Sequence, residues 1–210
     1  MNLLEAIHKR RAVRAYRYEQ PSRQQLRTII EAASWAPSAM NDQDWRFIVI
    51  TDRALLDKIA KKAKAWILSS AEQNEHLRRI LNDPQSHLLH HAPALVIIAA
   101  PAKHRWATEN CALAAENLML AAAELGLGTC WIGMIQEWLN SSEGRTLVGL
   151  TAADRAMAPI VVGYAKGEIG PVPRRNPAIV WIGDNERLVE DGTGIQPVGV
   201  PGLYGALIHP

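Results

Sequence analysis

Cysteine is scarce, because the 210-residue sequence contains only Cys111 and Cys130. Two thiols cannot complete a zinc site by themselves, and this pair lacks the Cys-x-x-Cys spacing of a redox or metal motif. Both stand in strongly apolar sequence. We therefore expect buried, reduced thiols and a cytoplasmic protein.

Long apolar runs and an excess of charge are also missing. The longest uncharged apolar run, residues 92–102, is too short to cross a bilayer. No apolar segment precedes the basic run near the N-terminus, which argues against a secretory signal. The formal net charge is only +2, so neither a nucleic acid nor a membrane is expected as a partner.

The common phosphate-binding loops are absent as well. The sequence contains no Gly-x-x-x-x-Gly-Lys loop, no Gly-x-Gly-x-x-Gly loop after a strand and no Gly-x-Ser-x-Gly elbow. Gly126 and Gly128 stand close together, but they follow a predicted helix instead of opening one. Any phosphate bound by this chain must therefore be held by cationic side chains.

The residues that are present predict one domain of mixed helices and strands. A length of 210 residues with 48% apolar and 21% charged residues is typical of a single globular domain. A capping-box pattern at Ser22 and Gln25 marks a helix start, and Pro37 ends that run. Apolar spacing predicts further helices over residues 2–10, 53–82 (with a break near Ser69) and 107–125, and strands over residues 47–50, 95–98, 130–132, 160–162 and 180–182.

Two segments are more apolar than an exposed surface requires. Helix 107–125 has leucines on several sides among many alanines, which places it at the centre of the fold or in an oligomer interface. Residues 184–210 are rich in glycine and proline, yet they include apolar residues that a free tail would not need. We expect a domain over residues 1–183 and a C-terminal extension, residues 184–210, packed on that domain or on a partner subunit.

The basic run over residues 8–14 offers the cations that a phosphate needs. Arg10 and Arg14 are four residues apart, so they would share one face of a helix. Guanidinium groups match the oxygen geometry of phosphates and carboxylates. The alternative is a solvated basic helix end, where cations also favour the helix dipole.

The loop over residues 36–45 concentrates small residues, amides and one hydroxyl. Its backbone can approach a flat ligand, and Asn41 and Gln43 offer hydrogen-bond donors and acceptors. The alternative is an ordinary connection between a helix and a strand, with Trp45 anchored in the core.

His87 and His91, four residues apart on a predicted helix, raise the question of a metal. No carboxylate or cysteine stands nearby in the sequence to complete a ligand set. We therefore interpret the pair as surface or packing histidines and predict no metal site.

Together, these segments resemble the FMN-dependent nitroreductase family. Residues 10–16 (Arg-Arg-Ala-Val-Arg-Ala-Tyr) are similar to the family's Arg-Arg-Ser-x-Arg-x-Phe opening, and residues 36–45 to its Ala-Pro-Ser-x-x-Asn-x-Gln-Pro-Trp motif. Residues 112–133 resemble its alanine-rich helix and the strand that follows. Residues 160–164, with Arg174 and Arg175, resemble its closing strand and basic residue. The resemblance spans about residues 2–183.

The resemblance implies an α+β, three-layer fold with a central, mostly antiparallel sheet flanked by helices. It implies an intertwined homodimer with two FMN sites at the interface. The implied activity is that of a flavoprotein oxidoreductase, in which NADH or NADPH reduces the flavin and the flavin reduces a small acceptor, a nitroaromatic or a quinone, in ping-pong order. No side chain is expected to be catalytic, since the flavin carries the chemistry.

The resemblance also implies roles for individual residues. Arg10 looks like the main phosphate ligand, with Arg174 or Arg175 completing the clamp, and Arg14 matches a cation at the pyrimidine edge that stabilises the reduced ring. The other implied cofactor-binding residues are Arg11 at the phosphate or ribityl chain, Ala12, Pro37, Ser38 and Ala39, Asn41 at the ribityl oxygens, and Ile132 and Gly133 near flavin N5.

The sequence departs from the family pattern at two positions. Ala12 stands where the family has a serine, which removes one hydrogen bond to the ribityl chain, and Asp44 stands where it has a proline. A second ligand at the pyrimidine edge, expected within residues 65–80, is not assigned, although Asn74 is one candidate. The alternatives are a specialised flavin dehydrogenase, dehalogenase or flavin-consuming enzyme on the same scaffold, and a noncatalytic FMN-binding protein.

Overall fold

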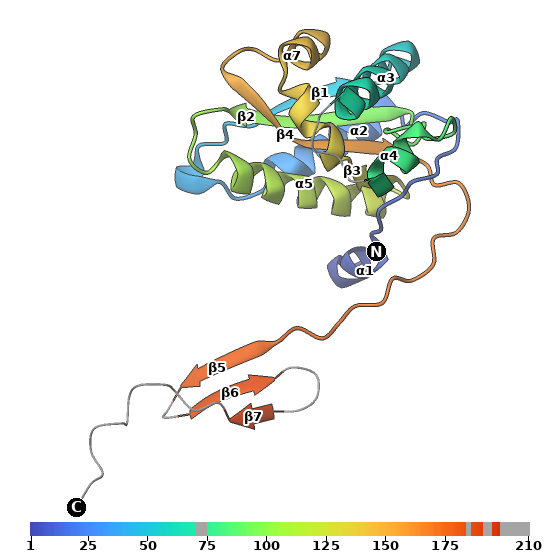
Figure 1. Cartoon of the computed structure of the whole chain (residues 1–210). Coiled ribbons are helices and arrows are strands. Elements are labelled where there is room, and N and C mark those ends of the chain that lie inside the picture. The colour runs from blue at the N-terminus through green and yellow to red at the C-terminus, as the bar shows by residue number, and fades with distance from the viewer. Residues whose placement is uncertain (70–74, 184–185, 191–194, 198–210) are drawn as a thin grey trace, which may run out of the picture. The chain divides into compact units, whose positions relative to one another are not determined.

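The structure, a computed structural model, describes residues 1–69, 75–183, 186–190 and 195–197 (Figure 1). It divides into two compact units, Met1–Ile169 and Gly170–Pro210. Our boundary from the sequence lay later, after residue 183. The packing of residues 184–210 on a surface stays a prediction, because most of that segment lies outside the described residues.

The centre of the first unit is a four-stranded antiparallel sheet with the strand order β1-β2-β4-β3 (Figure 1). All four strands predicted in this part of the sequence are present, and β2 and β4 are longer than predicted. The strands are β1 (Arg46–Ile50), β2 (Ala94–Pro101), β3 (Gly128–Trp131) and β4 (Asp154–Gly163).

Both faces of the sheet are buried at its central strands, β2 and β4. In β2, Leu95 and Ile97 belong to the apolar core on one face, whereas Val96 and Ile98 belong to the core on the other. Successive side chains of a strand point to opposite faces, so a strand covered on both sides is apolar at every position. Burial of both faces explains why residues 92–102 form the longest uncharged apolar run.

Helices cover both faces of the sheet (Figure 1). On one face lie α2 (Arg23–Ser34) and α5 (Ala107–Glu124), and on the other α3 (Arg53–Ser69) and α6 (Gln136–Leu139). The remaining helices are α1 (Leu3–Lys9), α4 (Glu75–Asn82), α7 (Ser142–Val148) and the short 3₁₀ turns η1 (Ala39–Asn41) and η2 (Gly133–Ile135). Of these, α1 packs against α5. The α+β fold with a central antiparallel sheet and flanking helices is thus confirmed.

Local sequence signals set several helix ends. The Ser22 hydroxyl accepts a hydrogen bond from the Gln25 N–H (3.1 Å), and the Gln25 side chain accepts one from the Ser22 N–H (2.9 Å), so the predicted capping box is confirmed. The break predicted near Ser69 stays a prediction, because α3 ends at Ser69, α4 begins at Glu75 and residues 70–74 lie outside the described residues. Within the described ranges, no helix has both the length and the apolar character needed to cross a membrane.

Helix α5 is buried on one side only within a single chain. Ala114, Ala115 and Leu118 are fully buried, whereas Leu113 on another side is 46% exposed. A second subunit could cover such an exposed apolar side. The homodimer stays a prediction.

The second unit contains a small antiparallel sheet with the strand order β5-β6-β7. The strands are β5 (Ile179–Gly183), β6 (Glu186–Glu190) and β7 (Ile195–Pro197). The strand predicted over residues 180–182 is confirmed.

Candidate functional site

The basic N-terminal segment is extended along the edge of the sheet. Helix α1 ends at Lys9, and the N–H of Val13 donates to the carbonyl of Thr129 in β3 (2.9 Å). The expectation that Arg10 and Arg14 share a helical face is therefore wrong. The chain leaves the helix because its backbone donors and acceptors find partners in β3 and beyond β4 instead.

A close backbone approach fixes where Arg14 lies. A Cβ atom placed on Gly128 would lie 2.4 Å from Cγ2 of Val13, a distance that no side chain tolerates without movement. Glycine at position 128 therefore allows the segment to lie directly against β3. Arg14, the next residue along the chain, is held near the end of that strand.

Arg14 lines a hollow of about 200 Å³ together with Ile132, Gly133 and His90. The structure thus brings together three of the residues expected at the flavin ring, although 118 positions separate Arg14 from Ile132 (132 − 14). A neighbouring hollow of about 350 Å³ also contains Arg14, with Tyr16 and His90 among its lining residues. Arg14 is exposed, so its guanidinium group is accessible to a ligand.

His90 is a further residue at this hollow, beyond those expected from the sequence. Burial, and then the positive charge of Arg14, lower the pKa of His90 below its ordinary value, so a neutral imidazole is favoured beside the hollow. No local pattern distinguishes His90 from His87 and His91. Its place beside Arg14 depends on contacts between distant parts of the chain.

Arg10 and Arg11 carry unsatisfied donors. Nε of Arg10 lies 3.6 Å from Oε1 of Glu116, and Nη1 of Arg11 donates to the carbonyls of Arg10 (2.7 Å) and His8. The Nε atoms of both arginines are buried without a hydrogen-bond partner. A buried donor without a partner destabilises the folded protein, and a bound acceptor would remove that cost. Phosphate oxygens match the geometry of guanidinium groups well. Both residues therefore fit a phosphate site.

The loop after α2 is held in a tight conformation. The backbone N–H of Ala39 donates to the side chain of the buried Asn110 in α5 (3.0 Å), and the N–H of Gln43 donates to the Ser38 hydroxyl (3.1 Å). Met40, Asn41 and Gln43 all have positive φ angles, between 50° and 57°. Non-glycine residues rarely adopt this conformation, and such strain is often found at functional sites.

His104 joins this loop to the segment after β2. Its Nε2 atom lies 2.9 Å from Asp42, and its Nδ1 atom lies 3.3 Å from Asp44. Asp44 is the position where the resemblance led us to expect a proline. The structure gives this departure a physical role, because a proline could not make the contact with His104.

Other expected site residues are not brought together within the chain as described. Neither hollow that contains Arg14 is lined by Pro37, Ser38, Ala39 or Asn41. Ala12 is exposed beside the basic segment. Arg174 and Arg175 are exposed residues of the second unit. Asn74 lies outside the described residues.

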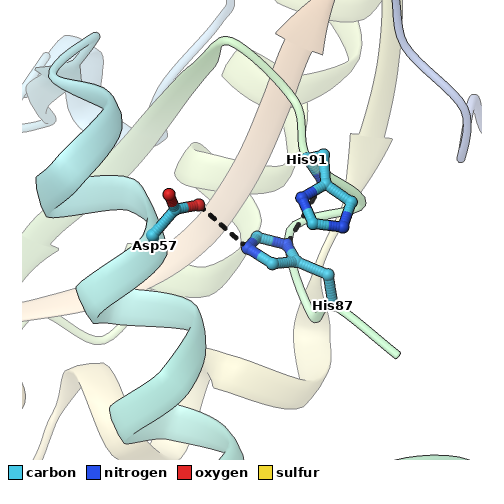
Figure 2. Close-up of side chains that lie close together, drawn as sticks. All are labelled: Asp57, His87 and His91. Atoms are coloured by element: carbon cyan, nitrogen blue, oxygen red, sulfur yellow. Dashed lines mark hydrogen bonds and ion pairs between the residues drawn. The ribbon is translucent and has the colours of Figure 1, made fainter. Parts of the chain in front are cut away.

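The interpretation of His87 and His91 needs two corrections. The two residues lie in a turn between α4 and β2, not on a helix, because Pro84 disfavours continuation of α4. A carboxylate is also present in space although not in the nearby sequence: Oδ1 of Asp57 in α3 lies 3.2 Å from Nε2 of His87 (Figure 2).

Comparisons with known proteins agree with this architecture. The profile of the nitroreductase family matches residues 7–164. A solved structure of a nitroreductase with bound FMN from Bacteroides fragilis is 29% identical, with 88% of this chain and 100% of that chain covered and a TM-score of 0.79.

Two curated relatives match more locally. A protein of Archaeoglobus fulgidus, whose name combines NADH dehydrogenase and NAD(P)H nitroreductase, is 43% identical over 58 residues, which are 28% of this chain and 33% of that protein. An iodotyrosine deiodinase of Thermotoga neapolitana is 36% identical over 59 residues, which are 28% of this chain and 32% of that protein. The alignments thus span about a third of the length of these relatives.

Proposed function

Because the chain belongs to the nitroreductase family, we propose that it is an FMN-dependent oxidoreductase. It takes hydride from NADH or NADPH and reduces a small acceptor of nitroaromatic or quinone type by a ping-pong mechanism. The observation that carries this proposal is the shared hollow of Arg14, Ile132 and Gly133. The FMN bound by the Bacteroides fragilis nitroreductase and the name of the Archaeoglobus relative support it.

Arg10 and Arg11 would hold the phosphate of FMN. Their buried Nε atoms lack hydrogen-bond partners, and a phosphate would supply acceptors with the required geometry. Arg174 or Arg175 would complete this clamp. Asn41 would bind the ribityl oxygens, while Pro37, Ser38 and Ala39 would approach the ring from the partner subunit.

Arg14 would tune the cofactor. When bound, FMN supplies the hydride and electron transfer, and the protein supplies binding, orientation and charge. A fixed guanidinium at the pyrimidine edge favours the more negative, reduced form of the ring. The exposed position of Arg14 in its hollow is compatible with this role.

Gly133 is the better candidate for a backbone donor at flavin N5. The N–H of Ile132 already donates to the carbonyl of Pro159 (2.8 Å), so it is not available to a ligand. Gly133 follows directly and lines the same hollow as Arg14. Ile132 would then contribute apolar contact instead of a hydrogen bond.

Reductive dehalogenation is a second candidate. The local match to an iodotyrosine deiodinase favours it, and such an activity would use the same flavin site with a different acceptor. The two candidates differ in which compound reoxidises the reduced protein.

The test is an anaerobic absorption spectrum of the purified protein, recorded before and after addition of NADH and then NADPH. We expect a flavin band that bleaches. After removal of the nucleotide, a quinone, a nitroaromatic or an iodinated phenol should restore the band and thus identify the acceptor class. A band that neither nucleotide bleaches would contradict the proposed donor and favour a binding role. Absence of a flavin band after added FMN would overturn the proposal.

A further inference from the structure

Three side chains outside the proposed cofactor site lie close together (Figure 2). Asp57 comes from α3, and His87 and His91 come from the turn before β2. One ligand atom from each residue lies within 4.8 Å of the corresponding atoms of the other two. We propose that Asp57, His87 and His91 form a binding site for a divalent transition-metal ion such as Zn²⁺ or Ni²⁺.

The spacing of the first two ligands already suits such an ion. Oδ1 of Asp57 and Nε2 of His87 are 3.2 Å apart. A tetrahedral ion with bonds of about 2.0–2.1 Å holds neighbouring ligand atoms about 3.3 Å apart. The ring of His91 stacks on that of His87 at a centroid distance of 4.0 Å, and its exposed side chain can rotate to complete the set.

The chemistry of the ligands selects the class of metal. Two imidazoles and one carboxylate suit zinc, nickel or copper, and three protein ligands leave one position for water. Lys61 and Lys64 line the same hollow, of about 310 Å³. With a single carboxylate among the three ligands, the cluster does not suit Ca²⁺ or Mg²⁺, which depend on several oxygen ligands.

The local backbone is shaped in a way that brings the two histidines together. His90 and His91 have φ angles of 52° and 54°, a conformation that two consecutive non-glycine residues rarely adopt. The turn is closed by the N–H of His90, which donates to the carbonyl of His87 (2.8 Å). This turn places the His91 ring against that of His87.

Metal binding would change the tautomer of His87. At present the His91 N–H donates to Nδ1 of His87 (3.2 Å), which leaves the ring proton of the neutral form on Nε2, facing Asp57. Coordination through Nε2 requires that the proton move to Nδ1. The His91 N–H then loses its acceptor, so its hydrogen exchange should become faster in the metal-bound protein.

The experiment measures metal binding directly in the purified 210-residue chain, after treatment with a chelator. Calorimetric titration with Zn²⁺ should give one ion per chain, and Co²⁺ should give visible absorption bands of a four- or five-coordinate site. His87→Ala and His91→Ala should each weaken binding at least tenfold, and Asp57→Asn, at an exposed helix position, should weaken it severalfold.

His8→Ala is the matched control, because it removes an exposed histidine of α1 outside the cluster. It should leave Zn²⁺ binding unchanged, and circular dichroism should show that each variant folds. Absence of saturable binding, an equal effect of His8→Ala and His87→Ala, or no effect of Asp57→Asn would overturn the proposed site. The readout is independent of the flavin activity, so either proposal can fail without the other.

Discussion

Nε of Arg10 lies 3.6 Å from Oε1 of Glu116 and still has no hydrogen-bond partner. The carboxylate of Glu116 is about half exposed, so its charge is screened by solvent and compensates the arginine only in part. Arg10 therefore keeps a directed donor for an anion beside the partly screened carboxylate of α5.

Arg10→Ala should weaken FMN binding about tenfold or more, because a charge-assisted hydrogen bond contributes about 1.5–3 kcal/mol. Riboflavin, which lacks the phosphate, should bind the variant and the unchanged protein equally well. Flavin fluorescence titrations measure both affinities. Glu116→Gln, which removes the competing carboxylate, should not weaken FMN binding. An equal loss for FMN and riboflavin would contradict the phosphate role of Arg10.

Arg14→Ala should lower the reduction potential of the flavin and slow its reduction by NAD(P)H about tenfold, because a fixed cation near the reduced ring is lost. Arg14→Lys keeps the charge and should retain most of the potential. Anaerobic redox titration and stopped-flow absorbance give the two quantities. If the alanine variant kept both its potential and its rate, Arg14 would have no tuning role.

His104→Ala should loosen the loop over residues 37–44. Asp42 would lose its hydrogen bond to His104, Asp44 would lose its contact with Nδ1, and both carboxylates would be left without that neighbour. We expect the free energy of unfolding to fall by about 1 kcal/mol, as for the loss of one partly exposed hydrogen bond. Urea denaturation measures that change, and limited proteolysis should cut the loop faster. Adding Asp42→Asn and Asp44→Asn to His104→Ala should offset part of the loss. If the triple variant lost at least as much stability as His104→Ala alone, the result would argue against this pairing.

Cys111 should make the protein less stable at high pH. Burial, and then the negative charge of Asp44, raise the pKa of the thiol from 9.0 to about 12. Above pH 9 the unfolded chain therefore loses a proton that the folded chain keeps, so stability falls as the pH rises toward 12. Between pH 8 and 10.5 this loss is about 2 kcal/mol.

Urea denaturation of Cys111→Ala at pH 8 and pH 10.5 tests this expectation. The variant should show a shallower decline, with the remainder due to Cys130 and Tyr16, whose pKa values are also raised by burial. A decline identical to that of the unchanged protein would show that Cys111 does not titrate in this range.

Local sequence patterns predicted most of the first unit. The capping box of Ser22 and Gln25 and the apolar run of β2 depend on neighbours in the chain, so the sequence shows them directly. The pairing of Arg14 with Ile132 and Gly133 came from the family resemblance and not from a local pattern.

Contacts between distant segments could not be predicted in this way. Asp57 and His87 are 30 positions apart, and nothing in either neighbourhood signals the other. The helical spacing of His87 and His91 was misleading because Pro84 had already ended α4. Likewise, Asp44 could be seen as a departure from the family pattern, but its partner His104 could not be identified from the sequence.

The contact between Val13 and Gly128 has a consequence for the order of assembly during synthesis. The segment with Arg10, Arg11 and Arg14 emerges from the ribosome long before its partners: Thr129 accepts from Val13, Tyr164 accepts from Arg17, and Lys166 donates to Ala15. Such long-range pairing is slow to form. Arg10, Arg11 and Arg14 therefore cannot reach their final place until translation has passed Lys166, so the proposed FMN site would form only after synthesis of nearly the whole first unit.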